Sequence, residues 1–355
     1  MALFAIVGGH GAPGATVTAL AMLHAWPLQT GQRVLLAECD PDGGVILAGA
    51  LEGRLDASRG LGQLGVADRQ GQLAQTLMTQ LTDVSPSGTA DRLLLPGVSD
   101  PAQYSGLAYV WESLVNLLVA LEGQGVDVLI DLGRSGASGP SAVLARRADA
   151  VLVVARSTLR SLTTAHPRVA ALRADLDAHG GSDTLGLVLV EEGPYKASDV
   201  SARFGTPVLG LLPFAPDTAA VLSDGGNSHD RRFVRSPLLR SARTIIDEVR
   251  AQVSRRRAQL APPQFIAPEL TTHQNQALAT TFPVPPPVAG PVPPSGRPPV
   301  PGANAAGPRS GRYPGPVPPS PPAPRPMPNT AMPTAPIPSA GPTGELRPQA
   351  VSHAR

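Results

Sequence analysis

The chain has 355 residues and a formal net charge of +2, from 29 basic and 27 acidic residues, so charge alone predicts no nucleic-acid partner. Its single cysteine, Cys39, excludes an internal disulfide and fits a reducing cytoplasm, where we expect the protein. No segment holds the roughly eighteen uninterrupted apolar residues that a membrane span needs.

The first predicted element is a strand over Leu3–Val7, which favours a folded start over a signal peptide. Six further short apolar runs follow, with helical patterns between them. This alternation predicts an α/β fold with a mostly parallel sheet of about seven strands, covered by helices on both faces. The six later strands are expected at Val34–Ala37, Leu93–Leu95, Val128–Ile130, Val151–Ala155, Leu185–Val190 and Val208–Leu212.

Three helices are indicated by their apolar spacing. One runs from Val17 to Ala25, directly after a glycine-rich loop. A second, Leu107–Leu121, carries one apolar stripe and is expected to cover the core. A third, from Leu238 to about Leu260, is expected to close the domain.

The last quarter of the chain differs in composition from the rest, because 28 of the 41 prolines lie at or after Pro262. A segment so rich in Pro, Ala, Gly and Ser buries too little apolar surface to offset its ordering entropy. We therefore predict one folded domain over residues 1–258 and a disordered tail over 259–355. Proline runs such as Pro283–Pro286 act either as a spacer, which we favour, or as a ligand for aromatic grooves.

A glycine-rich loop follows the first strand and precedes the first helix. This order is the context of a phosphate-binding loop, whose glycines let backbone N–H groups approach phosphates at a helix N-terminus. Against the pattern G-x-x-x-x-G-K-[ST], the chain offers Gly9 and Gly14, then Ala15 in place of lysine, then Thr16. The pattern alone therefore favours an ordinary tight strand-to-helix turn.

Acidic residues follow two of the other predicted strands. Glu38 and Asp40 come after the second strand, and Asp131 ends an apolar strand of the Walker B form. A carboxylate in that position reaches Mg²⁺ through water, and the Thr16 hydroxyl is a second magnesium ligand.

Over residues 1–255, the order and spacing of these motifs resemble the ParA/MinD family of deviant Walker A P-loop ATPases. The lysine-free loop beside Glu38–Gly44 is similar to the CpaE/TadZ-like, actinobacterial members of that broad group. The resemblance implies a nucleotide loop made of Gly9, His10, Gly11, Gly14, Ala15, Thr16 and Val17.

The resemblance also implies a role for each of the other residues. His10 stands in place of the lysine that crosses to a dimer partner, and Ala15 in place of the lysine that cradles phosphate. Asp40 would be the catalytic acid of switch I, with Glu38 as a second candidate. Asp131 would hold Mg²⁺ through water, together with Thr16.

The function implied is ATP- and Mg²⁺-dependent positioning or partitioning of a chromosome, a plasmid, or a secretion or pilus machinery. It involves a homodimer when nucleotide is bound, and protein partners from the assembly. Ala15 removes a charge that steadies the transition state, so we expect weakened hydrolysis. The alternative is a pseudo-ATPase scaffold that binds partners without a nucleotide cycle. A reductase of the same superfamily is disfavoured because no cysteine cluster exists.

A cluster of arginines between Arg231 and Arg257 leaves a further choice open. It contacts DNA phosphates or an anionic membrane, or it is the solvated face of the last helix. Interspersed acids and the apolar stripe of this helix favour the solvated face.

Overall fold

A computed structural model of the protein describes residues 2–9, 14–56 and 58–260. Within these residues a single eight-stranded sheet forms the centre of the fold. All seven predicted strands are present, each within two residues of its expected bounds, and a two-residue strand was not predicted. The strands are β1 Leu3–Gly8, β2 Arg33–Glu38, β3 Thr82–Asp83, β4 Arg92–Leu95, β5 Val126–Asp131, β6 Ala150–Arg156, β7 Leu185–Glu191 and β8 Val208–Pro213.

The strand order β3-β4-β2-β5-β1-β6-β7-β8 places β1 near the middle of the sheet, and every pairing is parallel except that of β3 with β4. From β1 the chain builds one half of the sheet through β2, β4 and β5, and then crosses to β6, β7 and β8. The strand order thus reverses at the carboxyl end of β1, the kind of position where open α/β sheets bind ligands.

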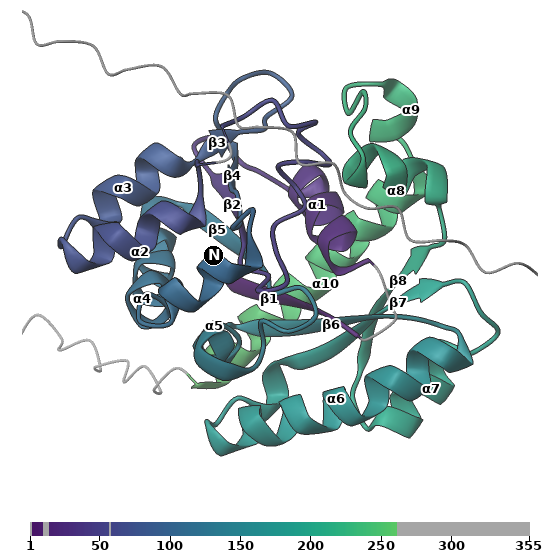
Figure 1. Ribbon diagram of the computed structural model, residues 1–355. Coiled ribbons are helices and arrows are strands. Elements are labelled where there is room, and N and C mark those ends of the chain that lie inside the picture. Colours follow the sequence, from purple (N-terminus) through teal and green to yellow (C-terminus); the bar gives the residue numbers. More distant parts are fainter. Residues whose placement is uncertain (1, 10–13, 57, 261–355) are drawn as a thin grey trace, which may run out of the picture. The chain divides into compact units, whose positions relative to one another are not determined.

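Helices cover both faces of the sheet, as the alternation of elements predicts (Figure 1). One face packs against α2 to α7, and the other against α1 and α8 to α10. The helices are α1 Ala15–Ala25, α2 Leu61–Arg69, α3 Leu73–Gln80, α4 Trp111–Ala120, α5 Ala142–Arg146, α6 Leu159–Ala178, α7 Ala197–Phe204, α8 Pro216–Ser223, α9 Arg231–Val234 and α10 Pro237–Leu260.

The helix predicted over Leu107–Leu121 is shorter than expected. It begins at Trp111, because a 3-10 segment, Pro101–Leu107, precedes it and the chain bends by 81° between the two. The predicted apolar stripe is nevertheless buried throughout, so its core-covering role is confirmed. Among the described helices no single one is both long and apolar enough to cross a membrane, and this bent pair meets the two conditions only when its parts are taken together.

The described domain ends with α10, whose Val249 and Val253 are buried against the sheet. Its last turns carry three consecutive arginines, each paired with an acid: Arg255 with Glu248 (3.1 Å), Arg256 with Asp183 (2.6 Å) and Arg257 with Asp149 (2.8 Å). These pairs support the solvated-face interpretation of this arginine run. The predicted boundary at residue 258 lies in the last turn of α10, and the predicted disordered tail beyond 260 lies outside the described residues.

Candidate functional site

A cavity of about 360 Å³ lies at the carboxyl end of β1, where the predicted motifs converge. The start of α1 contributes Gly14 to Val17, the loop after β2 contributes Asp40, and the turn after β5 contributes Gly133 and Arg134. The parallel register produces this convergence, because it sets Ile6 and Glu38 on either side of Asp131 at one edge of the sheet.

The N-terminus of α1 opens into this cavity without a side-chain cap. Gly14 precedes the helix at φ 146°, a backbone angle that favours glycine, and its carbonyl accepts the first helical hydrogen bond from Thr18 (2.8 Å). Uncapped N–H groups in a helix's first turn carry partial positive charge and are a ready anion site. The structure thus brings Gly14, Ala15, Thr16 and Val17 together as predicted.

The first half of the loop is only partly described. The Gly9 N–H donates to the carbonyl of Val154 on β6 (3.3 Å), which ties the loop to the sheet. His10 and Gly11, also predicted to contact nucleotide, lie outside the described residues. Ala15 is buried and packs toward Gly8, so the side chain that replaces lysine brings no charge into the cavity.

Asp131 is fully buried at the end of β5. Its Oδ1 accepts a hydrogen bond from the Gly133 N–H (3.0 Å), whereas its Oδ2 has no hydrogen-bond partner among the described residues. Burial raises the pKa of this carboxyl to about 6, and the nearby Thr16 hydroxyl acts in the opposite direction. A buried carboxylate oxygen without a partner, facing a hydroxyl, suits a divalent cation with oxygen ligands. Thr16 and Asp131 therefore fit the predicted Mg²⁺ site.

Glu38 is also buried, but both of its oxygens are occupied by backbone donors. Oε1 accepts from Val45 (2.8 Å) and Ile46 (3.0 Å), and Oε2 accepts from Gly97 (2.8 Å). Burial raises the pKa of Glu38 to about 7. These bonds give Glu38 a structural role, joining the loop after β2 to the end of β4, and its catalytic role stays a prediction.

Asp40 borders the cavity and lies against the turn after β5. A Cβ on Gly133, which has φ 51°, would lie 1.9 Å from the Asp40 carboxyl carbon, so only glycine permits this approach. Burial raises the pKa of Asp40, while the Asp42 N–H, Arg134 and Arg168 lower it. The catalytic role predicted for Asp40 remains a prediction, and its place beside Thr16 in the cavity is compatible with it.

Two arginines near these acids were missed by sequence reasoning. Arg134 lines the cavity and pairs with Asp42 (3.4 Å), and Arg168 of α6 acts electrostatically on Asp40 and Asp42. The position of Arg134 after Asp131-Leu132-Gly133 was a usable signal, whereas Arg168 is brought close only by tertiary folding. Ser135, whose hydroxyl donates to Asp42 (3.2 Å), lies in this same turn.

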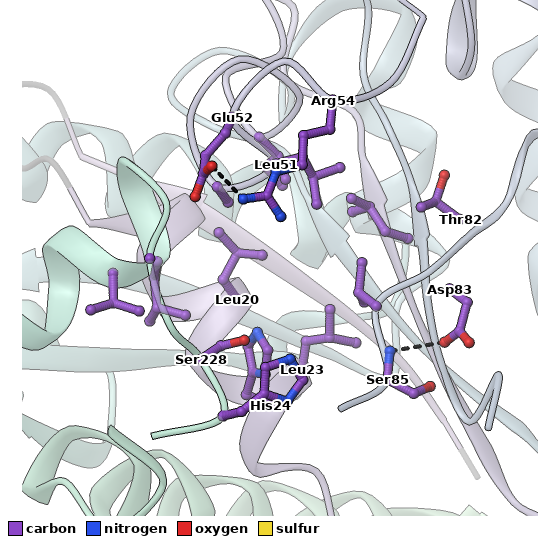
Figure 2. Close-up of a pocket in the computed structure, with 18 of the residues that line it drawn as sticks. Leu20, Leu23, His24, Leu51, Glu52, Arg54, Thr82, Asp83, Ser85 and Ser228 are labelled. Carbon is purple, nitrogen blue, oxygen red and sulfur yellow. Dashed lines mark hydrogen bonds and ion pairs between the residues drawn. The ribbon is translucent and has the colours of Figure 1, made fainter. Parts of the chain in front are cut away.

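A larger cavity of about 710 Å³ lies next to the first and shares Leu20, Ile46 and Leu222 with it (Figure 2). It is bounded by α1, the loop after β2, the β3–β4 edge and residues 226–229. Gly14, Thr16 and Asp40 line the smaller cavity and not the larger one, so we assign the candidate site to the smaller cavity. Among the described residues no three His, Cys, Asp or Glu side chains are grouped to hold another metal.

The arrangement of sheet, loop and helices matches solved structures. A ParA family ATPase from Chlorobium tepidum TLS gives a TM-score of 0.55 at 16% identity, covering 70% of this chain and 98% of that one. The chain has the fold of the ParA/MinD ATPases. Two further ParA/MinD structures match it, MinD from Pyrococcus horikoshii OT3 complexed with Mg-ADP (TM-score 0.51, 17% identity, 70% and 95% covered) and the MinC:MinD complex of Aquifex aeolicus (0.50, 18%, 72% and 96%).

Comparison by sequence finds no relative, in contrast to comparison by structure. No protein-family model matches the chain, and no curated protein matches it by sequence. The predicted fold class is therefore confirmed by structure, at identities under 20%.

Proposed function

We propose that this protein binds ATP with Mg²⁺ in the 360 Å³ cavity and uses nucleotide-linked dimerisation to position or partition a larger cellular assembly. The observation that carries the nucleotide proposal is the unpartnered, buried Oδ2 of Asp131 beside the Thr16 hydroxyl. Both groups lie next to the uncapped start of α1, where an anion is stabilised. A cation ligand set beside an anion site suits a Mg²⁺–polyphosphate.

Each residue then has a defined task. The first N–H groups of α1 would bind phosphate oxygens, and Thr16 and Asp131 would hold Mg²⁺, Asp131 through water. Bound Mg²⁺ supplies positive charge to the β- and γ-phosphates. Asp40, at the rim of the cavity, orients the attacking water and accepts its proton.

Hydrolysis is expected to be weak. The lysine of a P-loop steadies charge that moves onto phosphate oxygens, and transition-state contacts of this kind are worth about 3–4 kcal/mol. Ala15 is buried and uncharged, which favours slow turnover or a non-enzymatic scaffold as the second candidate. Slow turnover would keep the protein in the nucleotide-bound state for longer.

The positioning role is supported by the fold that the chain shares with ParA and MinD proteins. The Aquifex aeolicus structure contains MinD with a second protein, MinC, and we propose that this chain likewise acts with protein partners from the assembly it positions. We place it in the cytoplasm, peripheral to membrane or nucleoid, as a homodimer when ATP is bound.

Calorimetric titration with ATP and Mg²⁺ tests the binding proposal. Wild type is expected to bind MgATP with a dissociation constant below about 1 mM, within the usual range for enzyme substrates. Thr16→Ala and Asp131→Ala are expected to lose Mg²⁺-dependent binding. Thr244→Ala, on the exposed side of α10, is the matched control and should bind as wild type does. Absence of wild-type binding at millimolar ATP would refute the proposal.

Turnover separates the two candidate functions. Phosphate release is measured at saturating ATP for wild type and for Asp40→Ala. A clear loss in Asp40→Ala supports a slow ATPase switch. Equal rates, with binding retained, support the scaffold instead.

A further inference from the structure

We propose that Arg134 supplies the phosphate-binding positive charge that the chain lacks at Ala15. This inference rests on the nucleotide binding proposed above and adds the residue that makes it possible without the lysine. It concerns binding of the polyphosphate chain, through a side chain that comes from a different loop.

The side chain of Arg134 lies over the start of the phosphate loop. A Cβ on Gly8, the last residue of β1, would lie 3.7 Å from Arg134 Cγ and 3.2 Å from Ala15 Cβ. Arg134 and Ala15 therefore flank the same residue, and the absence of a side chain on Gly8 leaves room for the arginine. The stem of Arg134 thus lines the cavity beside Gly8 and Ala15, and we infer that its guanidinium reaches the position that a P-loop lysine occupies when phosphate is bound.

The backbone that carries Arg134 is fixed to β1. The Gly8 N–H donates to the carbonyl of Gly133 (2.8 Å), and the Leu132 N–H donates to the carbonyl of Ile6 (2.9 Å). The backbone at the base of the side chain is thus held, while the side chain itself is more than half exposed and has room to change partners. A held backbone and a mobile guanidinium suit a residue that changes its partner when a ligand binds.

The present partner of Arg134 is readily exchanged. Arg134 Nε lies 3.4 Å from Asp42 Oδ2, and such exposed ion pairs contribute little stability. A polyphosphate carries several charges and accepts bidentate hydrogen bonds from a guanidinium, which are stronger. After the exchange, Asp42 keeps the Ser135 hydroxyl (3.2 Å) and the nearby charge of Arg168.

No other described residue competes for this role. Arg134 is the only basic side chain among the described residues that line the cavity. Arg168 is half-buried, interacts electrostatically with Asp40 and Asp42, and does not line the cavity.

The test measures binding, by calorimetry, of MgATP and of magnesium tripolyphosphate, which has phosphates but no base or sugar. Arg134→Met keeps the aliphatic part of the side chain and removes its charge. It is expected to weaken the binding of both ligands by about 10- to 100-fold, as loss of a charged hydrogen bond does. Arg134→Lys keeps the charge but loses the bidentate fork of the guanidinium, so its affinity for both ligands is expected to fall between those of wild type and Arg134→Met.

The matched control is Arg147→Met. Arg147 has similar exposure and a loose pair with Glu112 (3.9 Å), but lies near Ala2 and Leu3 at the opposite end of β1, about 20 Å away. This variant should bind both ligands as wild type does. Weakening equal to that of Arg134→Met would trace the effect to net charge and overturn the inference.

The remaining outcomes separate this inference from the proposed function. If wild type binds MgATP and Arg134→Met binds it equally well, only the role of Arg134 is refuted. If Arg134→Met loses MgATP but not tripolyphosphate, Arg134 contacts the nucleoside, and the inference is again overturned. If wild type binds neither ligand, the proposed function fails as well. Unchanged thermal unfolding of each variant establishes that the fold is intact.

Discussion

His24 makes the stability of this domain fall in mild acid, and the size of the effect follows from its surroundings. It lies in the last turn of α1 and lines the larger cavity (Figure 2). Its ring meets Phe233 edge-on, with 5.7 Å between centroids. Burial, followed by the charges of Arg92 and His229, lowers the pKa of His24 from its ordinary 6.5 to about 4.

The sign of the effect follows from where the proton binds. Below pH 6.5 the unfolded chain protonates His24 while the folded chain does not, so acid favours unfolding. Each pH unit between the two pKa values costs about 1.4 kcal/mol. The stability contributed by neutral His24 is therefore complete above pH 6.5, and about 3 kcal/mol of it is lost by pH 4.

The assay is urea unfolding at pH 7.0 and pH 4.5 for wild type and for His24→Gln, which cannot titrate. On going from pH 7.0 to pH 4.5, the free energy of unfolding of the variant should rise by about 2.5 kcal/mol relative to that of wild type. Thr244→Ala is the control, because it lies on the exposed side of α10 and neither adds nor removes a titratable group. Its free energy of unfolding relative to wild type should be the same at both pH values. Parallel pH dependence of wild type and His24→Gln would refute the argument.

Three further substitutions test the site and its supports. Glu38→Ala leaves three backbone N–H groups without an acceptor and should lower the free energy of unfolding by about 3 kcal/mol or more, measured by urea at pH 6; a loss under about 1 kcal/mol would contradict the structural role. Gly133→Ala forces a strained φ and displaces Asp40, so we expect a loss of about 1–3 kcal/mol in the same assay; wild-type stability would show that the turn adapts. Arg256→Ala removes the exposed pair with Asp183 and should cost under about 1 kcal/mol, less at high salt; a larger loss in thermal melts would assign it a core role.

The sequence determined the fold class because buried strands and amphipathic helices are written in local patterns. Seven apolar runs marked all but one of the strands, and the missed β3 has only two residues, too few to give a pattern. The predicted helix over Leu107–Leu121 was right about burial and wrong about its start. Periodicity reports which side chains face the core, but it does not distinguish a 3-10 segment that bends before Trp111 from a straight helix.

The candidate site divides in the same way. Gly14, Thr16 and Asp131 could be predicted because each follows a recognisable strand or loop, and parallel strands bring their carboxyl ends to one edge. Tertiary structure alone decided the rest. The oxygens of Glu38 are occupied by N–H groups from the loop after β2 and from Gly97, 59 residues away, and Arg134 lies beside Gly8 because the β5 turn is bonded to β1. Chain packing sets the backbone hydrogen bonds to Glu38 and the strand pairing that brings Arg134 near Ala15. Local sequence patterns therefore do not show that the Glu38 carboxylate is already bound, or that a cation lies beside Ala15.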